Sequence, residues 1–392
     1  MTVEVERDQA FLDAIRRIAD EVAAPNAGAV DREARFPAES LAALREAGAL
    51  AAMIPTEYGG LGLPIETIAT AAFELGRRCG ASAMVFAMHQ IQIGTMIRHV
   101  DDDAPWFQAW LRRAAADQRL VASVTSEIGT GGDIGQSKAA ATVDEDGSIS
   151  FIKQAPTVSY GAYADDLFTT LRRSPEADGG DQVIVLTSRD QHELEQQGTW
   201  DPMGMRGTCS PGFTVKARFA PEQILPTPFS VVATESMVPV THILWSHLWL
   251  GIATDAFDRA RAFVRAAARQ NPDTPPPTAQ RLSHLMSELT LLRAEVASGL
   301  RDFTDADARD DREVLATMAS RLRFNNLKIA SSEMTPRICQ GALGVTGIVG
   351  YKNDTPFSVG RHLRDSLSAS LMVANERIHQ TNASLLLIAK DV

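Results

Sequence analysis

The chain has 392 residues, of which 45% are hydrophobic and 22% are charged, and its formal net charge is −11. This length allows two or three domains with substantial cores, and the acidic balance argues against a surface for nucleic acid or anionic membranes. Three widely spaced cysteines without a CxxC pair argue against a disulfide framework and a zinc site, and they fit a reducing compartment.

The N-terminal segment, MTVEVERDQAF, is acidic and lacks the basic-then-apolar order of a secretory signal. The most apolar window of the chain, residues 242–253, is interrupted by His and Ser and is too short to span a bilayer. We therefore expect a cytoplasmic protein with neither a membrane nor a nucleic acid as its partner.

Residues 1–119 are predicted to form an N-terminal helical domain. An apolar stripe with spacings of three and four marks the first helix: Phe11, Ile15, Ile18 and Val22. The stretches FPAESLAALREAGAL and LPIETIATAAFELGRRCG each place Pro near a helix start and Gly behind its end, with Gly80 closing the second. Residues 81–100 are apolar nearly all round, which is typical of a buried central helix.

Residues 120–229 are predicted to form a middle β domain, barrel-like or sandwich-like, of about the usual domain size. The segment ATVDEDGSISFI has two alternating stretches around an Asp-Gly pair, which indicates a hairpin. The segments DQVIVLTS and GFTVKARFA add a β-branched run and a second alternating strand.

Residues 230–392 return to the helical period and are predicted to form a C-terminal helix bundle. One apolar seam comprises Leu282, Leu285, Leu289, Leu292, Val296 and Leu300. A second seam begins with Leu315, Met318 and Leu322, and the segment QNPDTPPP separates the first two long helices. The order of helices, strands and bundle predicts an α+β fold with segregated layers and not a βαβ sheet.

The segment VTSEIGTGGDIG, Val124–Gly135, is rich in glycine and resembles a phosphate-binding loop. It lacks the Lys-Ser/Thr pair of a Walker loop, and strands follow it where a dinucleotide fingerprint requires a helix. Taken alone, the pattern is more typical of a surface turn.

Five motifs occur in a fixed order along the chain: IPTEYGGLGLP, SEIGTGGD, Lys153 followed by Thr157, MGMRGTCS and RHLRD. Together they resemble the acyl-CoA dehydrogenase superfamily, over about Gln9 to Leu387. The resemblance implies a C-terminal bundle of four helices and FAD bound between the β domain and that bundle. It also implies a homodimer or homotetramer.

The resemblance places Ser126 along the flavin and Thr157 near flavin N5. Fixed hydroxyl and amide donors stabilise the negative charge that a flavin ring gains on reduction. Gly132 stands where the family usually has Ser. Without the family context, Ser126 and Thr157 would be ordinary strand residues.

Further cofactor candidates follow from the same resemblance: Val124, Gly131, Arg269, Gln340, Gly344 and Asn375. Arg269 corresponds to an arginine that reaches the FAD of a neighbouring subunit, although Pro272 and Asp273 replace the usual Phe and Gly. Gln340 and Gly344 lie in QGALGVTG, an altered form of a family loop near the pyrophosphate. Asn375 matches a residue that touches the ADP half of FAD.

Oxidation of a saturated acyl thioester requires a base that removes the α-proton while a hydride leaves the β-carbon. In most of the family this base is a Glu nine residues after the Arg of RD, and the count from Arg364 gives Val373. Some relatives carry the Glu on the first bundle helix, where this chain has Thr241 followed by His242. Both usual base positions therefore lack a carboxylate.

Glu376 lies about one helical turn beyond Val373 and is the candidate base. The alternative for Glu376 is a surface carboxylate paired with Arg377. Glu235, His242 and His89 are candidates from other walls, and the alternative for each histidine is a hydrogen-bonded structural residue.

The sequence thus predicts an FAD-dependent oxidoreductase that acts on a specialised acyl-CoA or acyl-carrier-protein thioester. Val373, Thr241 and His242 are assigned to the substrate, with the main-chain N–H of Val373 available to a thioester carbonyl. Electrons would pass to a partner protein or to oxygen, and no metal is expected. Two alternatives stay open: a flavin monooxygenase on the same fold, and a flavin-binding module without turnover.

Overall fold

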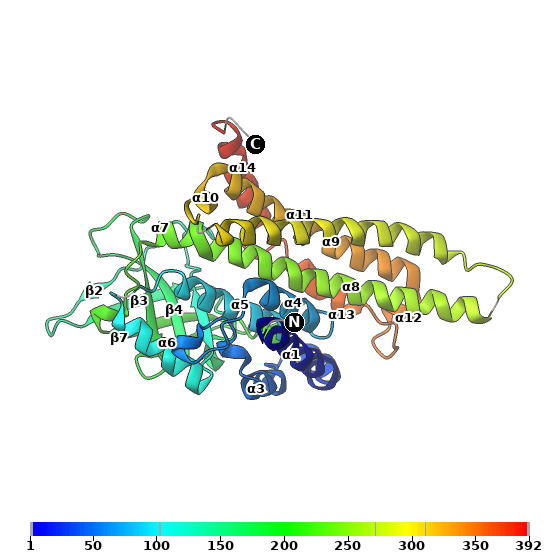
Figure 1. Ribbon diagram of the computed structural model, residues 1–392, viewed down its shortest axis with the longest axis horizontal. Helices are drawn as coiled ribbons and strands as arrows, with labels where there is room; N and C mark the ends of the chain where they lie inside the picture. The colour runs from blue at the N-terminus through cyan, green and yellow to red at the C-terminus, as the bar shows by residue number, and fades with distance from the viewer. Residues whose placement is uncertain (1–2, 102, 271, 310, 390–392) are drawn as a thin grey trace.

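The computed structural model describes residues 3–101, 103–270, 272–309 and 311–389. Strands gather at one end, three long helices extend from them to the other end, and the N-terminal helices cover one side (Figure 1). The α+β architecture with segregated helical and strand regions is as predicted. No helix in these ranges combines the length and hydropathy needed to cross a membrane.

Six helices make up the N-terminal region: α1 (Val3–Arg17), α2 (Ala24–Arg32), α3 (Ala38–Glu46), α4 (Ile65–Gly76), α5 (Gly80–Ile97) and α6 (Pro105–Asp117). The predicted stripe on the first helix is confirmed, since Phe11, Ile15 and Ile18 are buried. The prediction that Gly80 closes the second of these helices was wrong. Helix α4 ends at Gly76, and Gly80 is the first residue of α5.

Helix α5 is the buried central helix that the sequence predicts. It contacts α4, α8 and strand β1 (Val121–Val124), so nearly every face of it is covered. Because α5 touches both the helical layer and the strands, it sets their separation where the two regions meet.

Seven strands form two sheets. After β1 they are β2 (Thr142–Val143), β3 (Ile149–Ala155), β4 (Asp166–Arg172), β5 (Gln182–Ser188), β6 (His192–Gln197) and β7 (Gly212–Phe219). One sheet has the order β1-β4-β5, with β1 parallel to β4, and the other has the antiparallel order β2-β3-β7-β6. The predicted hairpin is confirmed, because Val143 pairs with Ile149 across the Asp-Gly turn.

The C-terminal region contains three long helices, α8 (Val238–Gln270), α9 (Thr278–Ala308) and α11 (Met318–Thr346). Shorter helices accompany them: α7 (Phe229–Val232), α10 (Glu313–Ala316), α12 (Ile348–Tyr351), α13 (Gly360–Leu367) and α14 (Asn375–Leu386). Helices α4 and α13 both pack on α8. The second seam was not predicted correctly: the chain breaks at Thr317, whose side chain caps α11, and Met318 is exposed.

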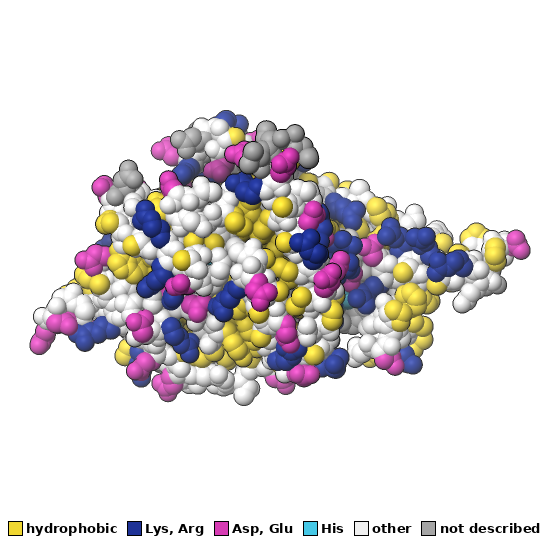
Figure 2. Space-filling view, turned by 60° about the horizontal axis from the view of Figure 1, so that its bottom comes forward, with side chains coloured by type: hydrophobic (Ala, Val, Ile, Leu, Met, Phe, Trp, Pro, Cys, Tyr) yellow, Lys and Arg dark blue, Asp and Glu magenta, His cyan; other side chains and the backbone are white. Residues whose placement is uncertain are grey.

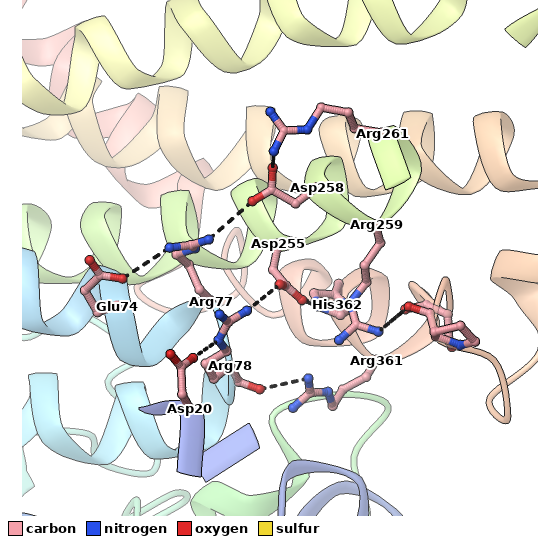
Figure 3. A network of polar contacts seen from close by, with 12 residues as sticks. Asp20, Glu74, Arg77, Arg78, Asp255, Asp258, Arg259, Arg261, Arg361 and His362 are labelled. Carbon is pink, nitrogen blue, oxygen red and sulfur yellow. Dashed lines mark hydrogen bonds and ion pairs between the residues drawn. The ribbon is translucent and has the colours of Figure 1, made fainter. Parts of the chain in front are cut away.

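A polar network ties α13 to the rest of the helical layer (Figure 3). Arg78, just after α4, binds both Asp20 and Asp255, at 2.6 and 3.2 Å. His362 of α13 donates its Nε2–H to Asp255 at 2.7 Å, and Arg361 donates to the carbonyl of Arg78 at 2.9 Å. The network fixes α13, and therefore the chain that follows it, on α8.

Charged side chains of both signs are intermixed on the face shown in Figure 2. Such a surface is solvated and provides no extended basic track for a polyanion.

Candidate functional site

A cavity of about 840 Å³ lies between the β domain and the helical regions. One wall comes from the end of β1, the glycine-rich loop after it and the segment after β3. The opposite wall comes from α5, α7, the start of α8, α11 and the turn before α14. A volume of this size is suited to a cofactor and a substrate together.

The β-domain wall is rich in hydroxyl groups. Five hydroxyl residues line it: Ser123, Thr125, Ser126, Thr157 and Ser159. Ser126 Oγ donates to the carbonyl of Thr157 at 2.8 Å, which joins the loop to the segment after β3. The hydroxyls of Ser123, Thr125 and Thr157 make no hydrogen bond to the protein within the described ranges, so they are available to a ligand.

Buried Glu127 holds the glycine-rich loop in place. Its carboxylate accepts from the N–H of Ala139 at 2.7 Å, the N–H of Lys138 at 3.0 Å and the hydroxyl of Ser137 at 2.8 Å. Lys153 Nζ lies 3.7 Å from the same carboxylate. Burial lowers the pKa of Lys153 to about 8, although the charge of Glu127 opposes that shift.

Arg377 of α14 crosses from the helical wall to the loop. Its Nε donates to the carbonyl of Gly131 at 2.5 Å. Gly131 has φ +62°, and a Cβ there would lie 2.6 Å from the guanidinium of Arg377. Only glycine therefore permits both this backbone conformation and this close approach.

His242 faces the cavity from α8. Its Nδ1 lies 3.0 Å from the carbonyl of Phe324 and must donate to it, so Nε2 carries the lone pair. Burial, assisted by the positive charge of Lys328, lowers the pKa of His242 to about 3, and the ring is neutral. Nε2 has no hydrogen-bond partner among the residues that the structure describes.

The turn before α14 forms another edge of the cavity. Val373 lies in this turn with φ +46°, a left-handed conformation that is rare for a β-branched residue. Lys328 Nζ donates to the carbonyl of Val373 at 3.0 Å and to Asn375 Oδ1 at 2.6 Å.

Charge in the cavity is mainly positive. Arg321 and Arg377 line it, and Asp133 carries the one carboxylate among its described lining residues. Asp133 is exposed on the glycine-rich loop, where its side chain accepts from the N–H of Gly135 at 2.9 Å.

A family model for the acyl-CoA dehydrogenase N-terminal domain matches residues 5–132. The human mitochondrial short-chain specific acyl-CoA dehydrogenase is 24% identical over 92% of this chain and 85% of its own length. A probable acyl-CoA dehydrogenase of Bacillus subtilis, YngJ, is 25% identical over 93% and 94% of the two chains.

Butyryl-CoA dehydrogenase from Megasphaera elsdenii superimposes with a TM-score of 0.81 at 18% identity, over 99% of both chains. The chain therefore resembles acyl-CoA dehydrogenases along nearly its whole length, in sequence and in fold. TdsC, a dibenzothiophene monooxygenase from a Paenibacillus species solved with FMN bound, also superimposes with a TM-score of 0.81, at 20% identity over 96% and 97% of the two chains.

Six predicted site residues meet at the cavity: Ser126, Gly132, Thr157, Thr241, His242 and Val373. The Thr241 hydroxyl donates to the carbonyl of Met237 at 2.6 Å, so its proton is already engaged. Val124 and Gly131 are neighbours of lining residues and do not line the cavity themselves.

Glu376 lies in the first turn of α14, exposed and outside the cavity lining. Its expected surface partner, Arg377, binds the glycine-rich loop instead. The role of Glu376 as base stays a prediction, and no contact in the structure supports it. Glu235 is likewise absent from the lining.

His89 is not a cavity base, which corrects its candidacy. Its Nε2 lies 2.7 Å from the carbonyl of Leu50, and its Nδ1 accepts from the N–H of Val121 at 3.1 Å. Both ring nitrogens are therefore engaged, and burial lowers the pKa of His89 to about 4.

Three predicted cofactor residues lie away from the cavity. Arg269, Gln340 and Gly344 are exposed near the far ends of α8 and α11. At 1.5 Å per residue, Arg269 is about 40 Å along α8 from Thr241. Contact of these residues with a cofactor in a neighbouring subunit stays a prediction.

Asn375 is buried and bonded within the protein. Its side-chain amide donates to Ser332 Oγ at 3.1 Å and to Glu333 Oε1 at 3.2 Å. Its predicted contact with the ADP half of FAD is untested, and its present partners give it a structural role.

The residues present fit a flavin. Three cavity-lining side chains have a buried polar atom without a partner in the described part of the chain, which the cofactor or a substrate beside it would satisfy: Gln92 Oε1, Gln182 Oε1 and Trp245 Nε1. The opposite wall contributes aromatic and thioether side chains, including Phe229, Phe324 and Met237. A flat ring with a polar edge meets hydroxyls on one side and apolar groups on the other.

Sequence reasoning missed Ser123, Ser159, Gln92, Trp245 and Lys328. Their positions follow ordinary helix or strand patterns, and no spacing distinguishes them from core or surface residues. Thr125 lies inside the glycine-rich segment and could have been found there. No group of three or more potential metal ligands occurs in the described ranges.

Proposed function

We propose that this protein is a flavin-dependent oxidoreductase that introduces a double bond next to the carbonyl of an acyl thioester, with FAD as its cofactor. One observation carries the proposal: a hydroxyl-lined wall of the β domain faces His242 and Val373 across one cavity. The relatives named as acyl-CoA dehydrogenases support the reaction class, and they cover 92% or more of the chain.

Bound flavin supplies hydride-accepting chemistry, and the protein supplies orientation and proton handling. The free hydroxyls of Thr125 and Thr157 would hold the polar edge of the ring as hydrogen-bond donors. The main-chain N–H of Val373 orients the thioester carbonyl and stabilises the negative charge that develops on it. The apolar side chains of the helical wall exclude water from the reacting carbons.

His242 Nε2 is the proton acceptor that the geometry supports best. The bond from Nδ1 to Phe324 fixes the ring and leaves the Nε2 lone pair free. A neutral imidazole with a low pKa is a weak base before the substrate binds. Negative charge developing on the substrate raises its proton affinity, because an adjacent opposite charge favours the protonated imidazole.

The near absence of carboxylates from the described cavity lining supports a second function, that of a flavin monooxygenase. Apart from Asp133, the described cavity lining has no carboxylate, and TdsC has the same fold. A flavin monooxygenase that takes up reduced flavin and oxygen needs no thioester base. Its substrate would occupy the same apolar wall.

The deciding experiment is anaerobic mixing of the purified yellow protein with acyl-CoA and acyl-carrier-protein thioesters, followed by oxygen. We expect thioesters to bleach the flavin absorbance before oxygen enters. Absence of bleaching, together with a hydroxylated product once reduced flavin and oxygen are supplied, would establish the monooxygenase instead. A colourless protein that takes up neither FAD nor FMN would contradict both functions.

Three variants then assign the base. His242→Asn keeps a donor for the Phe324 carbonyl and removes Nε2, so it should slow flavin reduction by about a hundredfold, within the usual range for general bases. Glu376→Gln should leave the rate unchanged, and a comparable loss would assign the base to Glu376. Val373→Glu restores a carboxylate at the usual family position and should accelerate reduction in the His242→Asn background.

A further inference from the structure

We propose that Lys328 is a positioning residue that holds the turn at Val373 in its left-handed conformation and so keeps the main-chain N–H of Val373 available to the thioester carbonyl. This inference deepens the proposed function and rests on it. Lys328 does not line the cavity, so it acts through the turn and not by touching the substrate.

Lys328 is completely buried in α11, with an exposed fraction of 0%. A fully buried lysine is rare unless its charge is compensated. Its two hydrogen-bond partners among the described residues, the carbonyl of Val373 and Oδ1 of Asn375, are both neutral oxygens. The buried ammonium therefore binds the turn directly and makes no direct ion pair within the described residues.

Both partners belong to one short turn: one is the carbonyl of its left-handed residue, Val373, and the other is the side chain of Asn375, two residues later. Val373 has φ +46°, which a β-branched residue adopts only when its surroundings impose it. A donor that bonds the carbonyl of Val373 and the side chain two residues later restricts rotation of the backbone between Val373 and Asn375. Lys328 is placed to impose the conformation.

Two other N–H groups of the turn are already used. Met372 N–H donates to the carbonyl of Ser368 at 3.1 Å, and Asn375 N–H donates to the carbonyl of Ser370 at 3.0 Å. The N–H of Val373 makes no hydrogen bond to another described residue, although Val373 lines the cavity. It is thus a free donor at the edge of the site.

Asn375 makes the arrangement rigid. Its amide group donates to Ser332 and Glu333 on α11, so its Oδ1 must face the Lys328 ammonium. The turn is therefore attached to α11 through a lysine donor and through two asparagine bonds. The positive charge of Lys328 also contributes to the low pKa of His242, after burial, and so favours the neutral imidazole.

The test compares Lys328→Met, Val373→Gly and the double variant, with Arg323→Met as the matched control. Methionine retains much of the buried chain and removes the three donors. Glycine adopts positive φ without the penalty of a branched side chain, so it replaces the conformational effect of Lys328. Arg323 lies on the same helix, pairs with Glu295 and Asp302, and does not line the cavity.

We expect Lys328→Met to slow single-turnover flavin reduction, per bound flavin, by about a hundredfold, the usual effect of losing one oxyanion donor. The dissociation constant of a non-reducible thioester analogue should change much less. The double variant should reduce flavin at least tenfold faster than Lys328→Met does, and Arg323→Met should react at the rate of the parent protein. Equal rates for Lys328→Met and the parent, or no recovery in the double variant, would overturn the proposal.

A crystal structure of flavin-loaded Lys328→Met gives a readout that needs no substrate. We expect the backbone of Val373 to leave the left-handed region, and a retained positive φ would contradict the inference. If no thioester bleaches the parent protein, the proposed function fails, while this structure still decides whether Lys328 holds the turn.

Discussion

The main-chain N–H of Met205 donates a 2.7 Å hydrogen bond to Oδ1 of buried Asp365, across 160 residues of sequence. The bond joins the MGMRGTCS segment to the RHLRD segment, two of the motifs that carry the family resemblance. Arg364 adds a bidentate ion pair to Asp31 of the N-terminal region. These two motifs therefore connect the three regions of the chain, and neither of them lines the cavity.

Gly204 allows this contact, because a Cβ there would collide with the carbonyl of Arg364. Gly204→Ala should lower the free energy of unfolding by about 1–3 kcal/mol, as overpacking usually does. Gly344→Ala is the matched control: an added Cβ meets nothing there, and the helix should gain about 0.5–1 kcal/mol. Denaturant unfolding of both variants checks the prediction, and a stable Gly204→Ala would contradict the close packing.

Buried Asp365 should make the stability of the folded protein depend on pH. Burial raises its pKa from 3.8 to about 6, so its contribution to stability is fully present below pH 3.8 and is lost as pH rises through 6. Asp365→Asn keeps an acceptor for Met205 and carries no charge. The stability of this variant relative to the parent should therefore be higher at pH 8 than at pH 4.5, as measured by urea unfolding. A pH-independent difference would contradict the shift.

Six buried histidines should lower the stability of the protein as pH falls, whereas Asp365 lowers it as pH rises. They are His89, His99, His192, His242, His247 and His362. Burial lowers the pKa of each from 6.5 to about 3 or 4, so their stabilising contribution is present above pH 6.5 and is lost as pH falls toward 4. The thermal midpoint should fall steeply between pH 6.5 and pH 4.5. His362→Gln retains a donor for Asp255 and should make that decline shallower.

Thr157 tests the hydroxyl-lined wall. Thr157→Val removes a free hydroxyl from the cavity wall that faces the expected flavin. The rate of flavin reduction by the substrate should fall about tenfold, which corresponds to the free energy of about one hydrogen bond. The absorbance spectrum of bound flavin should shift in the same variant. Thr290→Val, which removes an exposed hydroxyl on α9, is the control and should change neither quantity.

Gln92 and Trp245 indicate that the acyl group of the substrate carries a polar substituent. Each lines the cavity and has a buried polar atom without a protein partner in the described ranges, an acceptor on Gln92 and a donor on Trp245. An acyl chain with a hydroxyl or amide group satisfies them, whereas a plain hydrocarbon leaves them unpaired. Polar acyl thioesters should react at least tenfold faster than plain ones, and Trp245→Phe should reduce that preference.

Much of this fold could be predicted because its signals are local. The seam of Leu285, Leu289 and Leu292 identifies a helix from spacing alone, and the Asp-Gly turn identifies a hairpin. The site depends instead on which distant residues meet. The sequence around Lys328 reads as an ordinary helix, and nothing in it reveals that its ammonium reaches Val373. Glu376 is a candidate base because it lies near Val373 in sequence, but the structure places it exposed in the first turn of α14.

The bond between Arg377 and Gly131 spans 246 residues and joins α14 to the glycine-rich loop. During synthesis, the glycine-rich loop leaves the ribosome long before the arginine that secures it. The loop is thus fixed only after residue 377 has left the ribosome, and a protein shortened before residue 377 should fold its strands yet fail to retain the proposed flavin.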